Sequence, residues 1–303
     1  MVEQKAAHAL KAQIFTIAIS MALIVIKAVA FAFSGSLAVL SSLIDSALDV
    51  SVSGMNYAAV SYSSKPADED HRYGHGKIEG LAALLQAMLI AGGAVLLLWQ
   101  AISRLITPVE IESHILIIAV MTVSAVFSQL IVAIQNHAIK KSGSLAIEAD
   151  NANYTADIFM NGGVILTVVV QYFSGPMWID TVFGLAVACW LCILARRVGG
   201  KGLDMVLDRE LPQSERQKLL DLIASHKEVL GVHDLRTTRS GMKEIIAFDI
   251  EVDPSLLLYN AHAITKDLER EILEIFPHAE IMIHVDPHGD IDDSRHTVGG
   301  VHH

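Results

Sequence analysis

Two pairs of oxygen-bearing side chains stand four residues apart within otherwise apolar stretches of the chain. Asp45 and Asp49 occur in SLIDSALDV, and Asn153 and Asp157 repeat the spacing in EADNANYTADIFMN. Residues four apart on a helix share a face, so each pair projects to one side of its helix. If the two helices meet, the carboxylates repel one another unless they are protonated or bind a cation. The pattern therefore predicts a divalent-cation site at which protons compete.

A second group of potential ligands lies in the connection PADEDHRYGHGKIE, which contains Asp68, His71 and His75. Two histidines four residues apart with a nearby carboxylate suit a borderline-soft cation such as Zn²⁺. Surface loops also contain histidines that bind nothing, so spacing alone leaves a metal site and a solvated loop equally open. Cys189 and Cys192 have the spacing of a metal or redox pair, but for apolar residues three apart on a helix packing is the favoured interpretation.

The segments that carry these residues are long and apolar enough to cross a membrane. The chain has 303 residues, of which 52% are hydrophobic, and its mean hydropathy is +0.47. A helix that crosses a hydrocarbon core of roughly 30 Å needs about 20 residues. Six spans are predicted, at residues 12–33, 37–61, 80–104, 114–136, 146–172 and 177–198. The first runs on from MVEQKAAHALKAQIF without a cleavage site, which argues against a removable signal peptide.

Carboxylates inside such spans favour a functional site over structural pairing. The structural alternative pairs the acids with a basic residue such as Lys27 in the first span. One lysine against three carboxylates leaves two negative charges without a partner. A charge at the bilayer centre costs about 3 kcal/mol on insertion scales, so such groups normally face a cavity, a partner or an ion.

Basic residues in the short connections predict the orientation of the spans. Ten fall on one side: Lys5, Lys11, Lys65, Arg72, Lys77, Lys140, Lys141, Arg196, Arg197 and Lys201. The other side has only Arg104. Because cytoplasmic loops are enriched in Lys and Arg, both termini are expected in the cytoplasm.

The region after the last span is acidic and has the pattern of a small α+β domain. From residue 204 onward there are 20 Asp and Glu against 10 Lys and Arg, a composition that favours cations as partners and disfavours nucleic acid. Helical spacing predicts helices over 204–226 and 258–276, and VHDLRTT, KEIIAFDIEVD and EIMIHVD are predicted strands. We therefore expect a membrane domain at 1–203, a cytoplasmic metal-binding domain at 204–290 and a disordered, solvated tail at 291–303.

Taken together, these features resemble the cation diffusion facilitator family, in particular its bacterial YiiP-like members. The resemblance extends over residues 10–288 and rests on six spans, the two four-apart pairs, HRYGHGKIE, and an acidic α+β region with HDLRT and IMIHVDP. It implies a polytopic α-helical protein of the inner cell membrane with a metallochaperone-like cytoplasmic domain. It also implies a homodimer, not an enzyme, that exports divalent metal in exchange for protons and has no prosthetic group.

The resemblance also implies roles for individual residues. The transport site would be Asp45, Asp49, Asn153 and Asp157, and the loop site Asp68, His71 and His75. The cytoplasmic domain would bind regulatory metal through His233, Asp249, His262, His284 and Asp286. Lys77 and Asp208 would form a charge pair between the domains.

Two positions depart from the zinc-type pattern of the family and bear on the choice of metal. Asn153 and Asp249 stand where that pattern has histidine. Oxygen ligands suit harder cations, so we expect a preference among Mn²⁺, Fe²⁺, Co²⁺ and Zn²⁺ that is shifted toward Mn²⁺. The general affinity order opposes this expectation, because Zn²⁺ outcompetes Mn²⁺ at most sites.

Two other functions are considered for the same residues. A membrane metal sensor or scaffold would bind ions without moving them, and only a flux measurement separates it from a transporter. An intramembrane metallohydrolase would use Asp45 and Asp49 around an activated water, but the spans contain no HExxH-like pair of the kind such enzymes use.

Overall fold

The computed structural model describes residues 2–35, 37–106, 114–172 and 178–289 of the chain. These residues form two compact units, one of residues 3–204 and one that begins at Met205. The first unit contains α1 (Val2–Ser34), α2 (Leu37–Ser63), α3 (Ile78–Ile106), α4 (His114–Ser142), α5 (Leu145–Tyr172) and α6 (Trp178–Val206). The second contains α7 (Gln213–Ser225), β1 (Gly231–Ser240), β2 (Lys243–Val252), α8 (Leu258–Ile275) and β3 (Glu280–Pro287).

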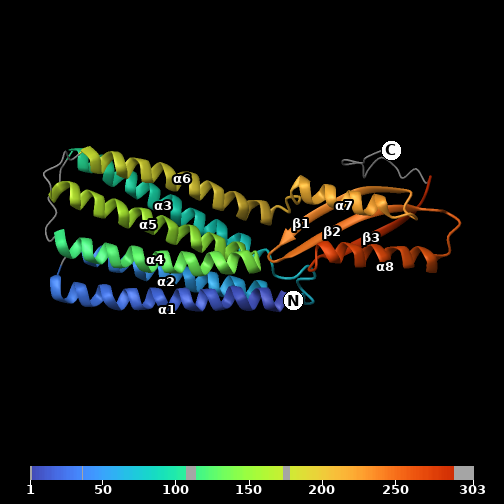
Figure 1. Ribbon diagram of the computed structural model, residues 1–303, viewed down its shortest axis with the longest axis horizontal. Coiled ribbons are helices and arrows are strands. Elements are labelled where there is room, and N and C mark those ends of the chain that lie inside the picture. Colours follow the sequence, from blue (N-terminus) through green and yellow to red (C-terminus); the bar gives the residue numbers. More distant parts are fainter. Residues whose placement is uncertain (1, 36, 107–113, 173–177, 290–303) are drawn as a thin grey trace. The chain divides into compact units, whose positions relative to one another are not determined.

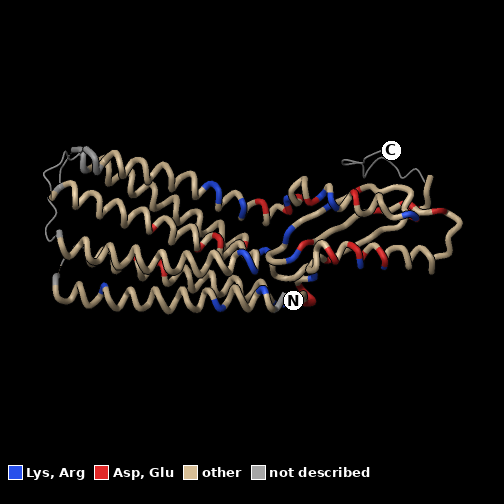
Figure 2. The backbone as a smooth tube through the Cα atoms, viewed as in Figure 1, with Lys and Arg blue, Asp and Glu red and all other residues tan. Residues whose placement is uncertain are grey.

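The six helices of the first unit run lengthwise beside one another (Figure 1). Five of them, all except α2, are long and apolar enough to cross a membrane. The α2 helix has 27 residues, which is long enough, but its sequence includes two aspartates and seven serines. In the tube view the bundle is almost free of charge along most of its length (Figure 2). Part of the polar content of α2 is explained by side chains that it directs toward α1, α3 and α5.

Glycine allows α6 to pack closely on α3. A Cβ atom at Gly202 would lie 2.8 Å from the backbone oxygen of Gly80 and 3.1 Å from Cγ of Leu84. At Gly199 a Cβ atom would lie 3.2 Å from that of Ala87. Small residues of this kind let membrane helices approach until their backbones touch.

The second unit is a three-stranded sheet covered on one face by α7 and α8. The strand order is β1-β2-β3, with β1 antiparallel and β3 parallel to β2. Alternation in β2 sends Ile246, Phe248 and Ile250 into the core, where residues of both helices complete the cluster. The opposite face of β2 presents Asp249 and Glu251. The helical membrane region followed by a small α+β unit confirms the predicted fold class.

One predicted helix differs from the structure. The sequence predicted a single helix over 204–226, but α6 extends to Val206 and α7 begins only at Gln213. Between them the chain turns at Asp208, whose φ is 55°, and Pro212 caps α7. Proline has no N–H to donate and disfavours helical geometry in the residue before it, which separates the two helices. The predicted tail at 291–303 lies outside the described residues.

Candidate metal sites

The two four-apart pairs of the sequence meet across the α2–α5 contact. Asn153 Nδ2 of α5 donates a hydrogen bond of 3.0 Å to Asp49 Oδ1 of α2. Asp157 lies one turn further along α5, and its Oδ2 atom is buried without a hydrogen-bond partner among the described residues. Asp45 is exposed in the single chain. The structure therefore brings together Asp49 and Asn153, with an unsatisfied carboxylate oxygen on the next turn.

The geometry of this group differs in two respects from a closed metal site. Among the described residues, Asp45, Asp49 and Asp157 do not form a set whose ligand atoms all lie within 4.8 Å of one another. Asn153 also directs its amide nitrogen, not the expected oxygen, toward Asp49. Coordination by Asn153 would require the amide to rotate by half a turn, so that its oxygen faces the ion.

Lys27 does not neutralise these acids by direct pairing. Its buried ammonium donates to the backbone oxygen of Ser42 at 3.0 Å and to Ser46 Oγ at 2.7 Å. Within the described part of the chain, no carboxylate forms an ion pair with it. Lys27 still contributes a positive charge to the electrostatic environment of all three acids. Direct pairing with Lys27 therefore does not account for these acids, and Lys27 affects them only as a nearby positive charge.

The loop between α2 and α3 gathers Asp68, His71 and His75. Asp68 Oδ1 lies 3.3 Å from His71 Nδ1, and Asp68 Oδ2 lies 3.2 Å from His75 Nε2. The three ligand atoms lie within 4.8 Å of one another, and the donor set of two imidazoles and one carboxylate fits Zn²⁺ or a similar cation. Two residues are exposed, whereas the buried His75 packs edge-on against the ring of Tyr62.

Backbone hydrogen bonds hold this loop and keep its carboxylate charged. The N–H of His71 donates to Asp68 Oδ1 at 2.7 Å, and the N–H of Gly74, with φ +78°, donates to the oxygen of His71 at 2.9 Å. The bond from the His71 N–H is the main reason that the pKa of Asp68 lies below its usual value. Asp68 therefore remains an anionic ligand at mildly acidic pH.

In the second unit the three strands bring His233, Asp249 and Asp286 together. His233 pairs in register with Asp249, which pairs with His284 on β3. His233 Nδ1 lies 3.8 Å from Asp249 Oδ2, and His233 Nε2 lies 3.5 Å from Asp286 Oδ2. The ligand atoms of the trio lie within 4.8 Å of one another. Partial burial raises the pKa of Asp249, while His233 and His284 act in the opposite direction.

The remaining predicted ligands of this unit lie at or beyond the edge of the trio. His284 Nε2 contacts Asp286 Oδ1 at 3.0 Å, whereas His262 is exposed on α8 and is not part of the cluster. Glu251 was not predicted as a ligand, yet its carboxylate lies 3.9 Å from His233 Nε2 and 2.7 Å from His288 Nδ1. The alternation of β2 placed Glu251 on the same face as Asp249 and was a usable signal.

The predicted charge pair joins residues of different units. Lys77 directly precedes α3, and Asp208 follows α6 and accepts a hydrogen bond of 3.1 Å from Thr238 Oγ1. Their pairing remains a prediction.

Two buried carboxylates of the bundle were also missed. Asp150 lies on α5 and accepts hydrogen bonds from Ser53 and Gln135. Glu79 lies on α3, accepts from Ser144 Oγ at 2.5 Å, and also bonds Ser63 and the first turn of α5. Each is a single acid near a predicted span end, where a solvated position is the simpler expectation.

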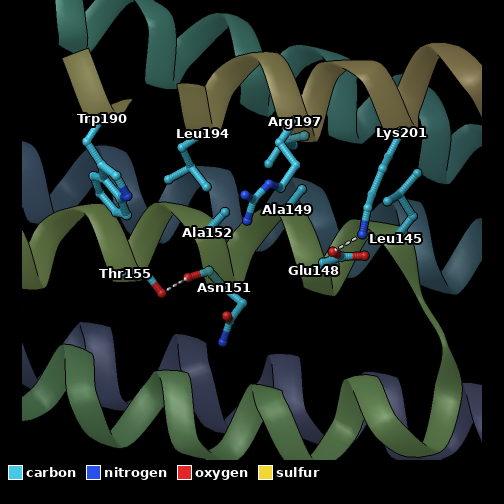
Figure 3. Close-up of a pocket in the computed structure, with 11 residues that line it drawn as sticks. Leu145, Glu148, Ala149, Asn151, Ala152, Thr155, Trp190, Leu194, Arg197 and Lys201 are labelled. Atoms are coloured by element: carbon cyan, nitrogen blue, oxygen red, sulfur yellow. Dashed lines mark hydrogen bonds and ion pairs between the residues drawn. The ribbon is translucent and has the colours of Figure 1, made fainter. Parts of the chain in front are cut away.

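A groove on the other side of α5 contains none of the predicted ligands. It is lined by α5 and α6, and Figure 3 shows Arg197 reaching from α6 toward α5 and Lys201 paired with Glu148. Asn151 and Thr155 of α5 also line it. The α5 helix thus has one polar side toward α6 and another, with Asn153, toward α2.

Both units of the chain match family models of known proteins. Residues 14–207 match the model of the cation efflux transmembrane domain, and residues 211–288 match that of the cation efflux protein cytoplasmic domain. Over 265 residues the chain is 37% identical to the cation-efflux pump FieF of Cronobacter sakazakii, covering 88% of each chain. It is 39% identical over 272 residues to FieF of Shewanella oneidensis, covering 90% of this chain and 92% of the relative.

A solved structure aligns with part of the chain. The metal-bound C-terminal domain of the CzcD transporter from Thermotoga maritima aligns over 27% of this chain and 100% of that domain. The identity is 27% and the TM-score 0.26.

Proposed function

The chain belongs to the cation diffusion facilitator family of cation-efflux transporters, and we propose that it exports divalent transition-metal cations from the cytoplasm in exchange for protons. Members of this family are transporters and not enzymes, which confirms the expectation of no enzymatic activity and removes the metallohydrolase alternative. The chain is a multi-pass membrane protein. It covers about nine tenths of its FieF relatives, so the proposal concerns the whole transport unit.

The hydrogen bond between Asn153 and Asp49 is the observation that carries the proposal. It joins the two four-apart pairs across the contact of α2 and α5, which supports their proposed role as transport ligands. Asp157 supplies a buried oxygen without a partner one turn away. Such an oxygen costs free energy in a membrane unless it binds a cation or a proton, which supports a site that exchanges the two.

We propose Mn²⁺ as the slightly favoured substrate, with Fe²⁺, Co²⁺ and Zn²⁺ as the other candidates. The four proposed ligands of the transport site, Asp45, Asp49, Asn153 and Asp157, contain no imidazole. An all-oxygen set suits Mn²⁺ better than a set that includes histidine. Zn²⁺ binds most mixed sites more tightly, so the preference concerns the ratio of the two metals rather than exclusion of zinc.

Transport would proceed by alternating access, with the ion held between α2 and α5 while the bundle opens first to one side and then to the other. Protons would return on the transport-site carboxylates vacated by the metal. The loop site and the site of the second unit would bind regulatory metal. The matched cytoplasmic-domain model, the basic residues of the connections and the family support a homodimer of the inner membrane with both termini in the cytoplasm.

The test is metal uptake into vesicles reconstituted with the purified protein under a proton gradient. We expect Asp49→Ala and Asp157→Ala to reduce uptake to the level of protein-free vesicles, because each removes an anionic ligand. Glu69→Ala, in the exposed loop, is the control and should transport normally. Wild-type uptake by either aspartate variant would refute the assigned site.

The same assay distinguishes the proposed transporter from the second candidate function, a membrane metal sensor or scaffold. Such a protein would bind metal at the sites described above but would move none. Wild-type protein that binds metal, yet shows no flux under any direction of the proton gradient, would favour the sensor.

A further inference from the structure

Asp150 is a buried carboxylate that the transport site does not include. It lies on α5, seven residues or about two turns before Asp157, and only 1% of its surface is exposed. Ser53 Oγ lies 3.2 Å from each of its oxygens, and Gln135 Nε2 donates to Oδ2 at 2.7 Å. Both partners are neutral, and no Lys, Arg or His of the described residues forms an ion pair with it.

The amides around Asp150 leave acceptors unused. Gln13, Asn56 and Gln135 are fully buried, and each has a side-chain oxygen without a hydrogen-bond partner among the described residues. These amides come from α1, α2 and α4, so neutral polar groups face Asp150 from three helices. The ionised form of Asp150 accepts a bond from one of these amides, Gln135, and from Ser53. The neutral form has an O–H that can donate to an unused amide oxygen.

Hydrogen-bond partners are therefore present for both the ionised and the neutral form of the Asp150 carboxyl group. A charge without a counterion is costly in this environment, and protonation removes that cost. The titratable and charged groups that influence Asp150 are Asp49 of α2 and, on its own helix, Tyr154 and Asp157. Gln86, which bonds Asn56, adds a neutral group from α3.

A hydrogen-bonded chain of hydroxyl groups starts at Asp150, and two of its members lie close in sequence to transport-site residues. Ser53 Oγ lies 3.0 Å from the Tyr154 hydroxyl, which lies 2.8 Å from Ser20 Oγ. Ser53 is one turn from Asp49 on the same face of α2, and Tyr154 directly follows Asn153. Hydroxyl groups both donate and accept, so each can take a proton from one side while it gives its own to the other.

From this arrangement we propose that Asp150 is a proton-binding site that receives protons from the transport site through Ser53. The proposal rests on the proton exchange proposed above and names a second residue for it. Because Asn153 cannot be protonated in the way an imidazole can, proton transport in this chain falls to carboxylates. Asp150 lies five residues beyond the start of α5, between the transport site and the proposed cytoplasmic end.

The step exchanges only O–H bonds. A protonated transport-site carboxyl gives its proton to the Ser53 hydroxyl, and Ser53 gives its own proton to Asp150. The transport-site group becomes a carboxylate ready for the next cation, and Asp150 becomes neutral. When the cytoplasmic half of the bundle opens, Asp150 releases the proton to water and is again a carboxylate.

The experiment measures proton flux and Mn²⁺ flux together in vesicles that contain the full-length protein and a trapped pH dye. We expect Asp150→Asn, which retains hydrogen-bonding groups but cannot be protonated, to lower the number of protons moved per Mn²⁺. Asp150→Glu should restore the ratio. A wild-type ratio in correctly folded Asp150→Asn would overturn the proposal.

A second pair of variants tests the path if Asp150→Asn does not fold. Ser53→Ala removes the hydroxyl link without changing a charge, whereas Ser51→Ala removes an exposed hydroxyl that, among the described residues, bonds the backbone oxygen of Ala47 alone. We expect only Ser53→Ala to lower the proton-to-metal ratio, and equal ratios in the two variants would overturn the proposal. If wild-type protein moves Mn²⁺ without protons, the exchange proposed above fails instead, so the two failures are distinguishable.

Discussion

At the scale of single residues, two of the three proposed metal sites have an oxygen-bearing side chain where the family resemblance implied a histidine. Asn153 contacts Asp49 in the bundle, and Asp249 lies beside His233 in the sheet. The loop site differs, because it retains two imidazoles beside Asp68. Harder cations are favoured by the first two sites and softer ones by the third. Selectivity for the substrate should therefore depend on position 153 and not on the loop.

Replacing Asn153 by His should raise Zn²⁺ transport relative to Mn²⁺ transport, because an imidazole would join the all-oxygen set. The measurement is side-by-side uptake of the two metals into vesicles. Asn151→His is the matched control, since Asn151 lies on the same helix but bonds the backbone oxygen of Val132 and lines the groove toward α6. An unchanged metal ratio in Asn153→His would show that selectivity is determined elsewhere.

At the scale of elements, α5 and α6 contact α3 in different ways. Glu79 of α3 anchors the first turn of α5, and it does so through the hydroxyl of Ser144 and the backbone N–H of Ala146. The α6 helix instead packs against α3 through glycine at positions 199 and 202. Polar anchoring to α3 fixes the helix that bears Asn153 and Asp157, whereas α6 combines close packing on α3 with the Lys201–Glu148 ion pair to α5.

The glycine contact yields a paired prediction within one helix. Gly202→Ala should destabilise the bundle by about 1–3 kcal/mol, a usual cost of overpacking, because the new Cβ would meet the Gly80 oxygen at 2.8 Å. Gly200→Ala should be neutral or stabilising, since nothing lies within 4 Å of that position and alanine favours a helix by about 1 kcal/mol. Thermal unfolding in detergent measures both. Equal midpoints would contradict the close approach of α3 and α6.

At the scale of the whole molecule, charge is unevenly distributed between the two units. The residues from 204 onward hold 20 acidic and 10 basic side chains, and the tube view shows red and blue concentrated there and at one end of the bundle (Figure 2). Such an acidic region attracts cations over several ångströms and raises their concentration near the protein. The proposed cytoplasmic end would thus be the one at which metal accumulates.

Cysteine labelling tests the proposed orientation in the membrane. In a Cys189→Ser, Cys192→Ser background, a cysteine at Glu69, in the exposed loop between α2 and α3, should react with a membrane-impermeant maleimide only in inside-out vesicles. A cysteine at Ile115, exposed at the start of α4, should react in intact cells. The reverse pattern would invert the predicted topology.

Sequence patterns predicted the elements because hydrophobicity and spacing determine them locally. The lengths of the apolar segments predicted the membrane helices, and the four-residue spacing predicted which faces of α2 and α5 carry the ligands. Strict alternation of apolar and polar residues predicted β2 and β3. The start of α7 was misplaced because helical spacing continued across Pro212, whose effect on the backbone outweighs the pattern.

What the sequence did not predict depends on contacts between elements. Asp150 resembled a lone acid near a span end, and only the approach of α1, α2 and α4 shows that amides enclose it. The orientation of the Asn153 amide is likewise a property of the α2–α5 contact. The family resemblance implied His262 as a ligand, yet His262 on α8 is not part of the cluster of His233, Asp249 and Asp286 within this chain.

The hydrogen bond from Asn153 to Asp49 links α2 to α5 at the proposed transport site. A metal ion coordinated by Asp49 Oδ1 and by the amide oxygen of Asn153 would have to replace this hydrogen bond. Metal binding would then exchange a direct hydrogen bond between α2 and α5 for a link through the ion, whereas the metal-free carrier would keep the direct bond.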